Sequence, residues 1–168
     1  GGTASLVAIN AANGELISPF GTKGEAPLLV DFGQTRTAAA NTPGIVFEDL
    51  VIMGSTPGEN EGAAPGHIRA FDVRTGALKW VFHTIPQPGE FGYDTWPKDA
   101  YKYMGGVDTW GEITVDEKRG IVYLPVASPK YELYGGDRHG NNLFADCLLA
   151  LDARTGKYLW HFQTIHHD

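Results

Sequence analysis

Residues 150–160 read Ala-Leu-Asp-Ala-Arg-Thr-Gly-Lys-Tyr-Leu-Trp, and the same pattern returns twice elsewhere in the chain. Residues 70–80 read Ala-Phe-Asp-Val-Arg-Thr-Gly-Ala-Leu-Lys-Trp, and a weaker copy at residues 8–16 reads Ala-Ile-Asn-Ala-Ala-Asn-Gly-Glu-Leu. Each copy has an apolar run, an Asp or Asn, a two-residue spacer, a Thr-Gly or Asn-Gly pair and a second apolar run. The glycine allows the positive φ of a tight turn, and the Asp or Asn side chain can bond the backbone of that turn. The pattern therefore predicts a β-hairpin that occurs three times.

The spacing of the copies predicts the fold class. The repeat glycines Gly14, Gly76 and Gly156 are 62 and 80 residues apart, and each strong copy follows two further β-rich runs. Four-stranded antiparallel units that recur in this way are typical of the blades of a β-propeller. We expect an all-β partial propeller with two complete four-stranded blades and part of a third. A β-sandwich is the alternative, but it does not explain the Trp four residues after the glycine in both strong copies.

The same spacing divides the chain into four segments. We expect a partial blade and a connection in residues 1–43, a blade in 44–84, an aromatic inter-blade insertion in 85–110, and a blade in 111–168 with an inserted loop at 128–146. In the first segment, residues 5–10 and 15–18 are expected to pair as a hairpin. Trp80 and Trp160 are expected to be largely buried at equivalent places, because a large flat ring can fill the wedge between neighbouring sheets.

The composition excludes several classes of function. The formal net charge is −7 and no basic stripe occurs, which argues against a nucleic-acid partner. No run approaches the roughly 18 apolar residues of a membrane-spanning helix. The lone Cys147 lies in an apolar run, which is typical of a small buried side chain. The chain starts with Gly1 rather than Met, so we expect it to be cut from a larger protein.

The repeat resembles the tryptophan-docking motif, Ala-x-Asp-x-x-Thr-Gly-x-x-x-Trp, of the pyrroloquinoline-quinone (PQQ) dehydrogenases. The resemblance covers about residues 44–168 and includes three further stretches, at residues 51–55, 106–111 and 160–168. Members of that family are eight-bladed propellers that hold the quinone and a Ca²⁺ ion at the central axis. The resemblance implies that this chain is about two and a half blades of such a propeller.

The resemblance also implies a cofactor site around Trp110. This residue stands in a glycine-flanked turn before a predicted strand, where the family places the Trp that lies under the quinone. An indole can stack on a planar, electron-poor ring, and neighbouring glycines allow a close approach. A core Trp, as assigned to Trp80 and Trp160, is the alternative. The further cofactor-binding residues implied by the resemblance are Asp108, Thr56 and Gly58.

The acidic loop at residues 58–62 is the implied metal site. Glu61 matches a Ca²⁺ ligand of the family, and Ca²⁺ prefers oxygen ligands. Because the loop length differs from that of the methanol-dehydrogenase branch, Glu59 is an alternative, and an ordinary solvated acidic loop is another. Ser128 stands where that branch has a ligating Asn. Its hydroxyl is a weaker ligand, and the departure resembles the glucose and broad-alcohol branches.

No catalytic residue is assigned within the chain. In the family, the His-Asp phrase that ends here at Asp168 is followed by x-Trp-Asp, whose Asp is the general base. We therefore expect the base just beyond Asp168, and Asp168 itself to help order the loop. His166 and His167 are interpreted as loop or core residues, because no zinc-ligand spacing occurs. Asp137 and Arg138 are expected to brace their loop as an ion pair.

The function implied by the resemblance is a periplasmic dehydrogenase. It would oxidise an alcohol or a sugar by hydride transfer to PQQ and pass electrons to a cytochrome or a membrane quinone. We expect the chain alone to be inactive, with Trp110 and Glu61 at the same end of the sheets. The alternative is a non-catalytic propeller that serves as a protein-binding scaffold. A short chain that builds propellers from several copies is a further reading, and open blade edges favour self-association.

Overall fold

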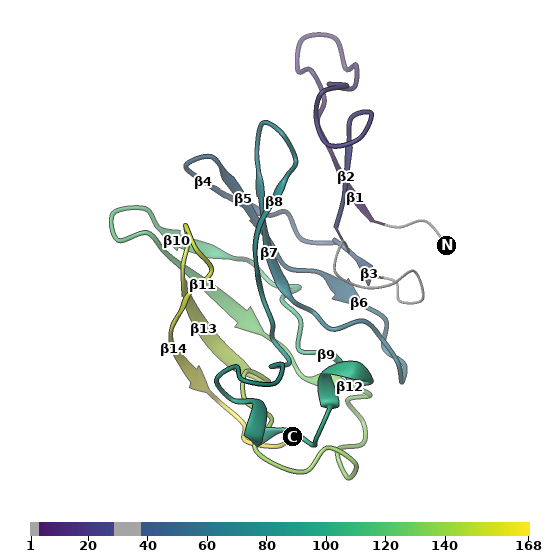
Figure 1. The fold of residues 1–168 in the computed structure, drawn as a ribbon, viewed down its shortest axis with the longest axis vertical. Helices are drawn as coiled ribbons and strands as arrows, with labels where there is room; N and C mark the ends of the chain where they lie inside the picture. Colours follow the sequence, from purple (N-terminus) through teal and green to yellow (C-terminus); the bar gives the residue numbers. More distant parts are fainter. Residues whose placement is uncertain (1–3, 29–37) are drawn as a thin grey trace.

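The computed structural model describes residues 4–28 and 38–168, and two four-stranded antiparallel sheets form most of it (Figure 1). The first sheet has the order β4 (Ile45–Phe47), β5 (Leu50–Met53), β7 (Ile68–Asp72) and β8 (Leu78–Phe82). The second has the order β10 (Thr114–Asp116), β11 (Ile121–Val126), β13 (Cys147–Asp152) and β14 (Tyr158–Gln163). The two sheets share one strand order, which confirms the two predicted four-stranded blades.

The repeated turns form because the Asp side chain bonds the backbone inside the turn. The Asp152 carboxylate accepts two such hydrogen bonds, of 3.0 and 2.9 Å. Gly156, at φ 69°, donates its N–H to the Asp152 carbonyl at 2.8 Å. Asp72 and Gly76 make the same contacts, again with φ 69° at the glycine. The sequence pattern therefore produces the same turn at both places.

One hydrophobic core fills the space between the two sheets. It takes side chains from β5, β7 and β8 on one side and from β11 and β13 on the other, and its fully buried members include Ile52, Ile68, Leu124 and Leu149. The two sheets also touch at their first strands, β4 and β10. Successive sheets stacked face to face are the arrangement of adjacent propeller blades. The fold is therefore an all-β partial propeller.

A tryptophan of the first sheet covers the repeat turn of the second. Trp80 is 8% exposed, and a Cβ at Gly156 would lie only 2.5 Å from its ring. The indole N–H donates a hydrogen bond to the Ala153 carbonyl at 3.2 Å. Glycine is required here both for the positive φ and for the approach of the ring. The predicted burial of Trp80 is confirmed.

Phe20, in the N-terminal unit, covers the turn glycine Gly76 of the first sheet. Its ring atoms lie 3.0 Å from where a Cβ on Gly76 would stand, and the side chain is buried. The repeat pattern did not predict this residue, because it places Ser18 where the other copies have Trp. A phenylalanine two positions later therefore takes the place of the docking tryptophan.

Trp160 differs from the prediction. It lies opposite Ala150 in its sheet, as Trp80 lies opposite Ala70, so the two positions are equivalent. Trp160 is nevertheless 41% exposed, and the prediction that it is largely buried is wrong. The reason is that, among the described residues, no further sheet covers the face of the second sheet that carries it.

The N-terminal unit stacks on the first sheet with a pairing that we did not predict. β1 (Ser5–Val7) pairs with β2 (Glu25–Pro27), so residues 5–7 do not join the predicted hairpin of residues 5–10 with 15–18. The hairpin forms over a shorter span, in which Ile9 bridges Leu16, the Asn10 N–H donates to the Glu15 carbonyl and the Ile17 N–H donates to the Ala8 carbonyl, both at 2.8 Å. Leu28 packs against Met53 and Phe71 on the other face of the first sheet. Residues 29–37 of the predicted connection lie outside the described residues.

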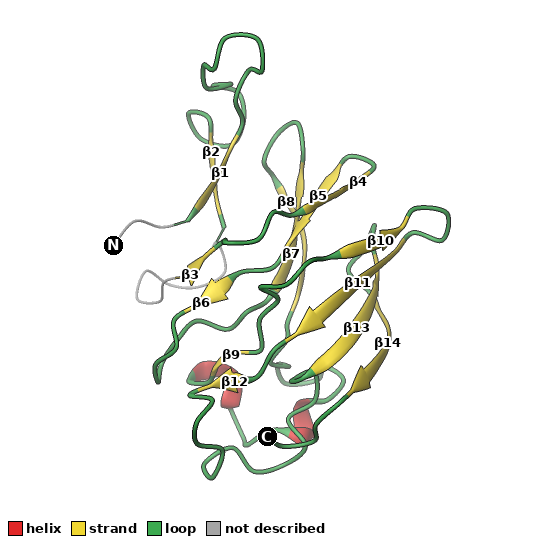
Figure 2. Ribbon diagram, turned by 180° about the vertical axis from the view of Figure 1, so that it is seen from behind, coloured by secondary structure: helices red, strands yellow, loops and turns green. Residues whose placement is uncertain are grey.

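Short elements close the ends of the blades (Figure 2). β3 (Ala38–Ala39) pairs with β6 (Thr56–Pro57), and β9 (Gly105–Gly106) pairs with β12 (Pro129–Lys130). The insertion before the second blade holds the short helices η1 (Tyr93–Thr95) and η2 (Ala100–Lys102). In the part of the chain that the structure describes, no helix has the length and apolar character needed to cross a membrane.

Candidate cofactor site

Backbone contacts join the loop after β6 to the segment before β10. Pro65 forms a bridge with Gly106, and the N–H of Gly66 donates to the Gly106 carbonyl at 2.7 Å. Gly66 lies so close to Asp108 that a Cβ would stand 2.2 Å from the Asp108 Cα. Only glycine allows this approach. The contacts bring Asp108 and its neighbours onto the loop that carries the predicted metal ligand.

Four buried side-chain oxygens of this region have no hydrogen-bond partner among the described residues. They belong to Ser55, Thr56, Asp108 and Thr109. Gly54 allows the chain at Ser55 and Thr56 to approach the chain at Asp108 and Thr109, since a Cβ on Gly54 would stand 2.2 Å from the Thr109 carbonyl oxygen. An unpaired buried polar group costs about 1–3 kcal/mol, so such groups are normally satisfied. The cluster therefore suits a ligand that brings its own polar groups.

Sequence reasoning identified half of this cluster. Thr56 and Asp108 were predicted as cofactor contacts from the resemblance. Ser55 and Thr109 were missed, although each is the chain neighbour of a predicted residue. Their hydroxyls are buried and unpaired because the two loops pack closely together. A local sequence pattern does not reveal that packing.

Asp108 is held in an environment that favours its neutral form. The side chain is 1% exposed, and burial raises the pKa of its carboxyl to about 6, although the charge of Lys130 acts in the opposite direction. Glu59 and Glu132 add to the rise through charge repulsion. Below about pH 6 this carboxyl can therefore donate a hydrogen bond, and above that pH it can only accept one.

Lys130 is a buried cation beside this cluster. Its side chain is 6% exposed, and its ammonium group lies 2.6 Å from Glu59 and 2.8 Å from Glu132. Burial alone would lower the pKa of Lys130, but the hydrogen bonds to Glu132 and Glu59 outweigh burial and raise it. Glu59, the alternative metal ligand, is therefore held by an ion pair. No sequence pattern singled out Lys130.

Trp110 is not a core residue. It is 61% exposed, and its ring lines a hollow of about 280 Å³ with Pro125, Val126 and Ala127. The Thr42 hydroxyl donates a hydrogen bond to the Trp110 carbonyl. The exposure separates Trp110 from the docked Trp80 and leaves the indole accessible to a planar ligand.

Glu61 lines a different cavity, of about 270 Å³. Lys130 and the aromatic side chains of Tyr103, Tyr131 and Tyr134 also line this cavity. Glu61 and Trp110 thus border separate hollows of one loop region. That Trp110 and Glu61 lie at the same end of the sheets stays a prediction.

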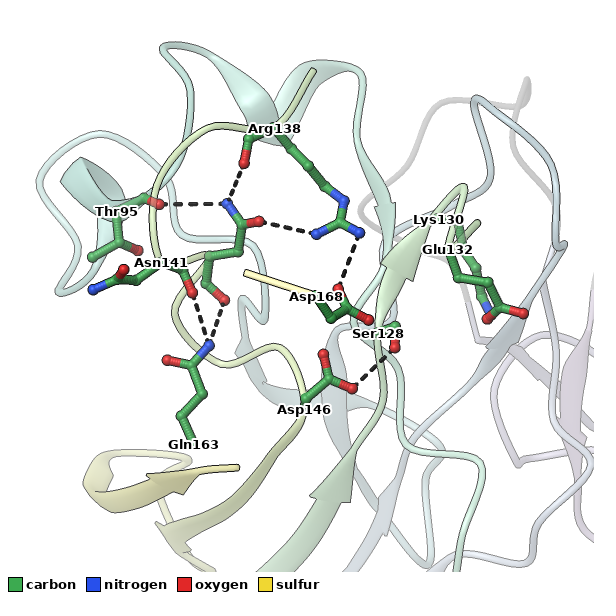
Figure 3. Close-up of polar contacts among 10 residues, drawn as sticks. Thr95, Ser128, Lys130, Glu132, Arg138, Asn141, Asp146, Gln163 and Asp168 are labelled. Carbon is green, nitrogen blue, oxygen red and sulfur yellow. Dashed lines mark hydrogen bonds and ion pairs between the residues drawn. The ribbon is translucent and has the colours of Figure 1, made fainter. Parts of the chain in front are cut away.

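Ser128, the second predicted metal ligand, is bound to a carboxylate. Its hydroxyl donates a hydrogen bond to the Asp146 carboxylate at 2.9 Å (Figure 3). Burial raises the pKa of Asp146. Residues 4–28 and 38–168 contain no cluster of three or more His, Cys, Asp or Glu side chains that could hold a metal ion. Glu61 and Ser128 therefore stay predicted metal ligands.

Arg138 connects the inserted loop to the end of the chain (Figure 3). It is 1% exposed, forms an ion pair of 3.0 Å with Asp168, and donates to the Asn142 side chain at 3.1 Å. The expected partner, Asp137, instead lines the cavity that contains Glu61. The predicted pairing of Asp137 with Arg138 is wrong because the guanidinium points inward to Asp168. Asp168 does hold the loop, as expected.

Comparisons with known proteins give one consistent result. Residues 2–168 match the PQQ family model described as glucose/ethanol/alcohol dehydrogenase, β-propeller domain. The chain is 33% identical over 169 residues to quinoprotein glucose dehydrogenase of Escherichia coli K12, covering 97% of this chain and 21% of that protein. It is also 33% identical to the dehydrogenase subunit of alcohol dehydrogenase (quinone) of Gluconacetobacter polyoxogenes, covering 97% of this chain and 24% of that subunit.

The structural comparison agrees with the sequence comparison. The solved structure of quinohemoprotein alcohol dehydrogenase ADHIIG from Pseudomonas putida HK5 has a TM-score of 0.77 to this chain at 27% identity. The match covers 98% of this chain and 24% of that structure. The chain thus spans between a fifth and a quarter of the length of these relatives.

Proposed function

Because this chain belongs to the PQQ family of glucose, ethanol and alcohol dehydrogenases, we propose that it forms part of the cofactor site of an enzyme that oxidises an alcohol or a sugar by hydride transfer to PQQ. One observation carries the proposal. Four unpaired buried oxygens lie on two joined loops, and the accessible indole of Trp110 follows directly after them in the chain. A planar ligand rich in polar groups suits both features.

The proposed roles follow from the contacts. Trp110 supports one face of the ring, while the Thr56 hydroxyl and the Asp108 carboxyl bind its polar substituents. Gly58 keeps the adjoining loop compact, because a Cβ there would lie 2.8 Å from the Asn60 side chain. When bound, the quinone supplies the hydride acceptor. The residues of this chain orient it and shield its edge from water.

The proposed place for the substrate is the 270 Å³ cavity beside Glu61. Its tyrosine side chains provide both hydroxyl groups and ring faces, which suit an alcohol or a sugar. The names of the two curated relatives, a glucose dehydrogenase and an alcohol dehydrogenase, agree with this substrate class.

The metal, the location and the electron acceptor complete the proposal. Glu61 and Ser128 are the proposed oxygen ligands of a Ca²⁺ ion, which takes six to eight such ligands, so most would come from other groups. The dehydrogenase would act in the periplasm and pass its electrons to a cytochrome or a membrane quinone.

The chain by itself should show no turnover. A site at a propeller axis draws on most blades, and the positioning of groups contributes effective molarities of about 10⁵ M or more. A general base, which none of the residues assigned above supplies, typically contributes a further factor of roughly 10²–10⁴. Dye reduction with added PQQ, Ca²⁺ and a panel of alcohols and sugars measures this, and turnover at an enzyme-like rate would contradict it.

PQQ binding to the chain tests the proposed site directly. The chain, Trp110→Ala and Trp160→Ala are titrated with PQQ by equilibrium dialysis. We expect the dissociation constant to rise about tenfold in Trp110→Ala, because loss of a stacked ring costs about 1–1.5 kcal/mol. Trp160→Ala, which removes an exposed indole far along the chain, should bind as the unmodified chain does. Equal binding by all three proteins would refute the assignment of Trp110.

A further inference from the structure

A further pocket lies at the junction of the two blades, apart from the cofactor site. Its volume is about 210 Å³, and both blades contribute to its walls. The first blade and the insertion that follows it contribute Phe82, His83, Glu90 and Phe91, and the second blade contributes Phe144 and Tyr158. None of these residues belongs to the proposed cofactor, metal or substrate site, so the pocket calls for a ligand of its own.

Four aromatic rings line this pocket and pack against one another. Phe144 is 2% exposed, and its ring centre lies 5.0 Å from that of Phe82 and 5.9 Å from that of Tyr158. The Tyr158 hydroxyl forms a hydrogen bond of 2.8 Å with a ring nitrogen of His161, which fixes the orientation of the tyrosine ring. The Phe91 ring lies 5.1 Å from that of Tyr158 and is 61% exposed. The rings thus form an ordered apolar wall that solvent reaches at Phe91.

A carboxylate that is held in place supplies the charge of the pocket. Glu90 accepts a hydrogen bond of 2.8 Å from Nδ1 of His83 and one of 2.7 Å from the backbone N–H of Gln87. The Gln87 side-chain amide donates to Nε2 of His83 at 3.2 Å, so this nitrogen is an acceptor and the imidazole is neutral. Among the residues that the structure describes, Glu90 makes its ion-pair contact with this imidazole and none with a Lys or Arg. The pocket therefore carries an uncompensated negative charge beside its aromatic rings.

We propose that this pocket binds a small organic cation with a methylated ammonium group, of about the size of choline. Aromatic rings attract such a cation, and the attraction grows as the cation loses its hydration. A metal ion suits the pocket less well, because it needs several oxygen ligands and the pocket offers one carboxylate. A neutral apolar ligand would cover Glu90 without compensating its charge, and burial of an unpaired charge is costly. The rings and the carboxylate together therefore favour the cation.

A ligand in this pocket should also stabilise the junction of the blades. It would contact Glu90 and Phe91, which follow the first blade, and Tyr158 of the second. A ligand that binds only the folded chain raises its stability as the ligand concentration exceeds the dissociation constant. The midpoint of thermal unfolding should therefore be higher in choline chloride than in sodium chloride at the same concentration, and equal midpoints would contradict the proposal.

Titration of the isotope-labelled chain with choline, followed through the ring signals of Phe91 and Tyr158, tests the site. The matched neutral probe is the dimethylbutanol in which a carbon atom takes the place of the choline nitrogen. We expect saturable shifts with choline and binding of the neutral probe that is weaker by about tenfold or more. Sodium chloride at the same concentrations is the control for ionic strength.

Two variants separate the contribution of the charge from that of the rings. Glu90→Gln removes the charge and keeps the size of the side chain, and Phe91→Ala removes the exposed ring. Each should weaken choline binding about fivefold. The matched controls are Glu117→Gln, in the exposed turn between β10 and β11, and Phe162→Ala, which is 66% exposed on β14 and does not line the pocket. Both controls should bind choline as the unmodified chain does.

Several results of the titration would overturn the proposal. They are an absence of saturable shifts beyond those of sodium chloride, equal binding of choline and the neutral probe, and binding by either pocket variant that equals binding by its control. Glycerophosphocholine should bind no more tightly than choline, because no Lys or Arg lines the pocket to pair with its phosphate. Tighter binding of this probe would assign the pocket to a lipid headgroup instead. Far-ultraviolet circular dichroism of each variant establishes that it is folded before it is compared.

Discussion

Arg138 illustrates how one buried side chain holds a long insertion in place. Its guanidinium joins Asn142, within the loop at 128–146, to Asp168 beyond β14. The Asn142 amide in turn donates to the Arg138 carbonyl at 2.9 Å, and the Gln163 side chain reaches the Asn142 carbonyl at 3.2 Å. These polar contacts add to the pairing of β12 with β9 in holding the loop in place.

Removing this guanidinium should destabilise the chain strongly. In Arg138→Met the Asp168 and Asn142 groups lose their partner, and breaking a buried ion pair costs about 3–5 kcal/mol. Urea unfolding measures the change in the free energy of unfolding. Arg119→Met is the matched control, because Arg119 pairs with Asp116 on the surface with its side chain 70% exposed. Equal unfolding midpoints for the two variants would contradict the role of Arg138.

Asp108 should make the stability depend on pH. Its pKa rises from 3.8 to about 6 on folding, so the folded chain binds this proton more tightly than the unfolded chain does. Stability should therefore fall as the pH rises from about 4 to about 6, by roughly 2–3 kcal/mol in total, and the loss should persist above pH 6.

Asp108→Asn removes this titration and isolates its contribution. The variant should match the unmodified chain near pH 4 and should be more stable by roughly 2–3 kcal/mol at pH 7.5. Urea unfolding at the two pH values measures the difference. A variant that is less stable at pH 7.5 than the unmodified chain would show that the carboxylate is stabilised there after all.

At the scale of strands and turns, local patterns were sufficient. The Asp-x-x-Thr-Gly turns and the runs beside them form from contacts within a few residues, so both four-stranded sheets could be predicted. The pairing of β1 with β2 could not, because it spans a connection without periodicity. The burial of Phe20 was missed, and the burial of Trp160 was predicted wrongly. Both depend on whether a neighbouring sheet or turn covers the ring, which the local sequence does not describe.

The contact of Trp80 with the turn of the second sheet should contribute strongly to the free energy of unfolding. Trp80→Ala removes a buried ring and its bond to Ala153, and should cost about 3–5 kcal/mol. Trp160→Ala is the matched control, since it occupies the same register on an uncovered face, and it should cost well under half as much. Urea unfolding measures both changes in the free energy of unfolding. A similar loss in the free energy of unfolding for both variants would show that the contact of Trp80 with the second sheet does not stabilise the chain.

At the scale of the whole molecule, stacked blades position the loops that carry the chemistry. The resemblance pointed to Thr56, Asp108 and Trp110, and the fold brings the first two together with Ser55 and Thr109 as unpaired buried oxygens. Lys130 could not be predicted, because its partner Glu59 lies on a different blade and only the fold joins them. The metal ligands Glu61 and Ser128 remain predictions, since neither belongs to a cluster of acidic or histidine ligands in the described chain.

We propose that PQQ binds at the joined loops that carry residues 55–56 and 108–110. Backbone and indole chemical shifts of the isotope-labelled chain, followed during a titration with PQQ, test it most directly. We expect saturable changes at Ser55, Thr56, Asp108, Thr109 and the Trp110 indole N–H, with the Trp160 indole unchanged. Changes confined to other parts of the chain, or no saturable change at any of these five residues, would contradict it.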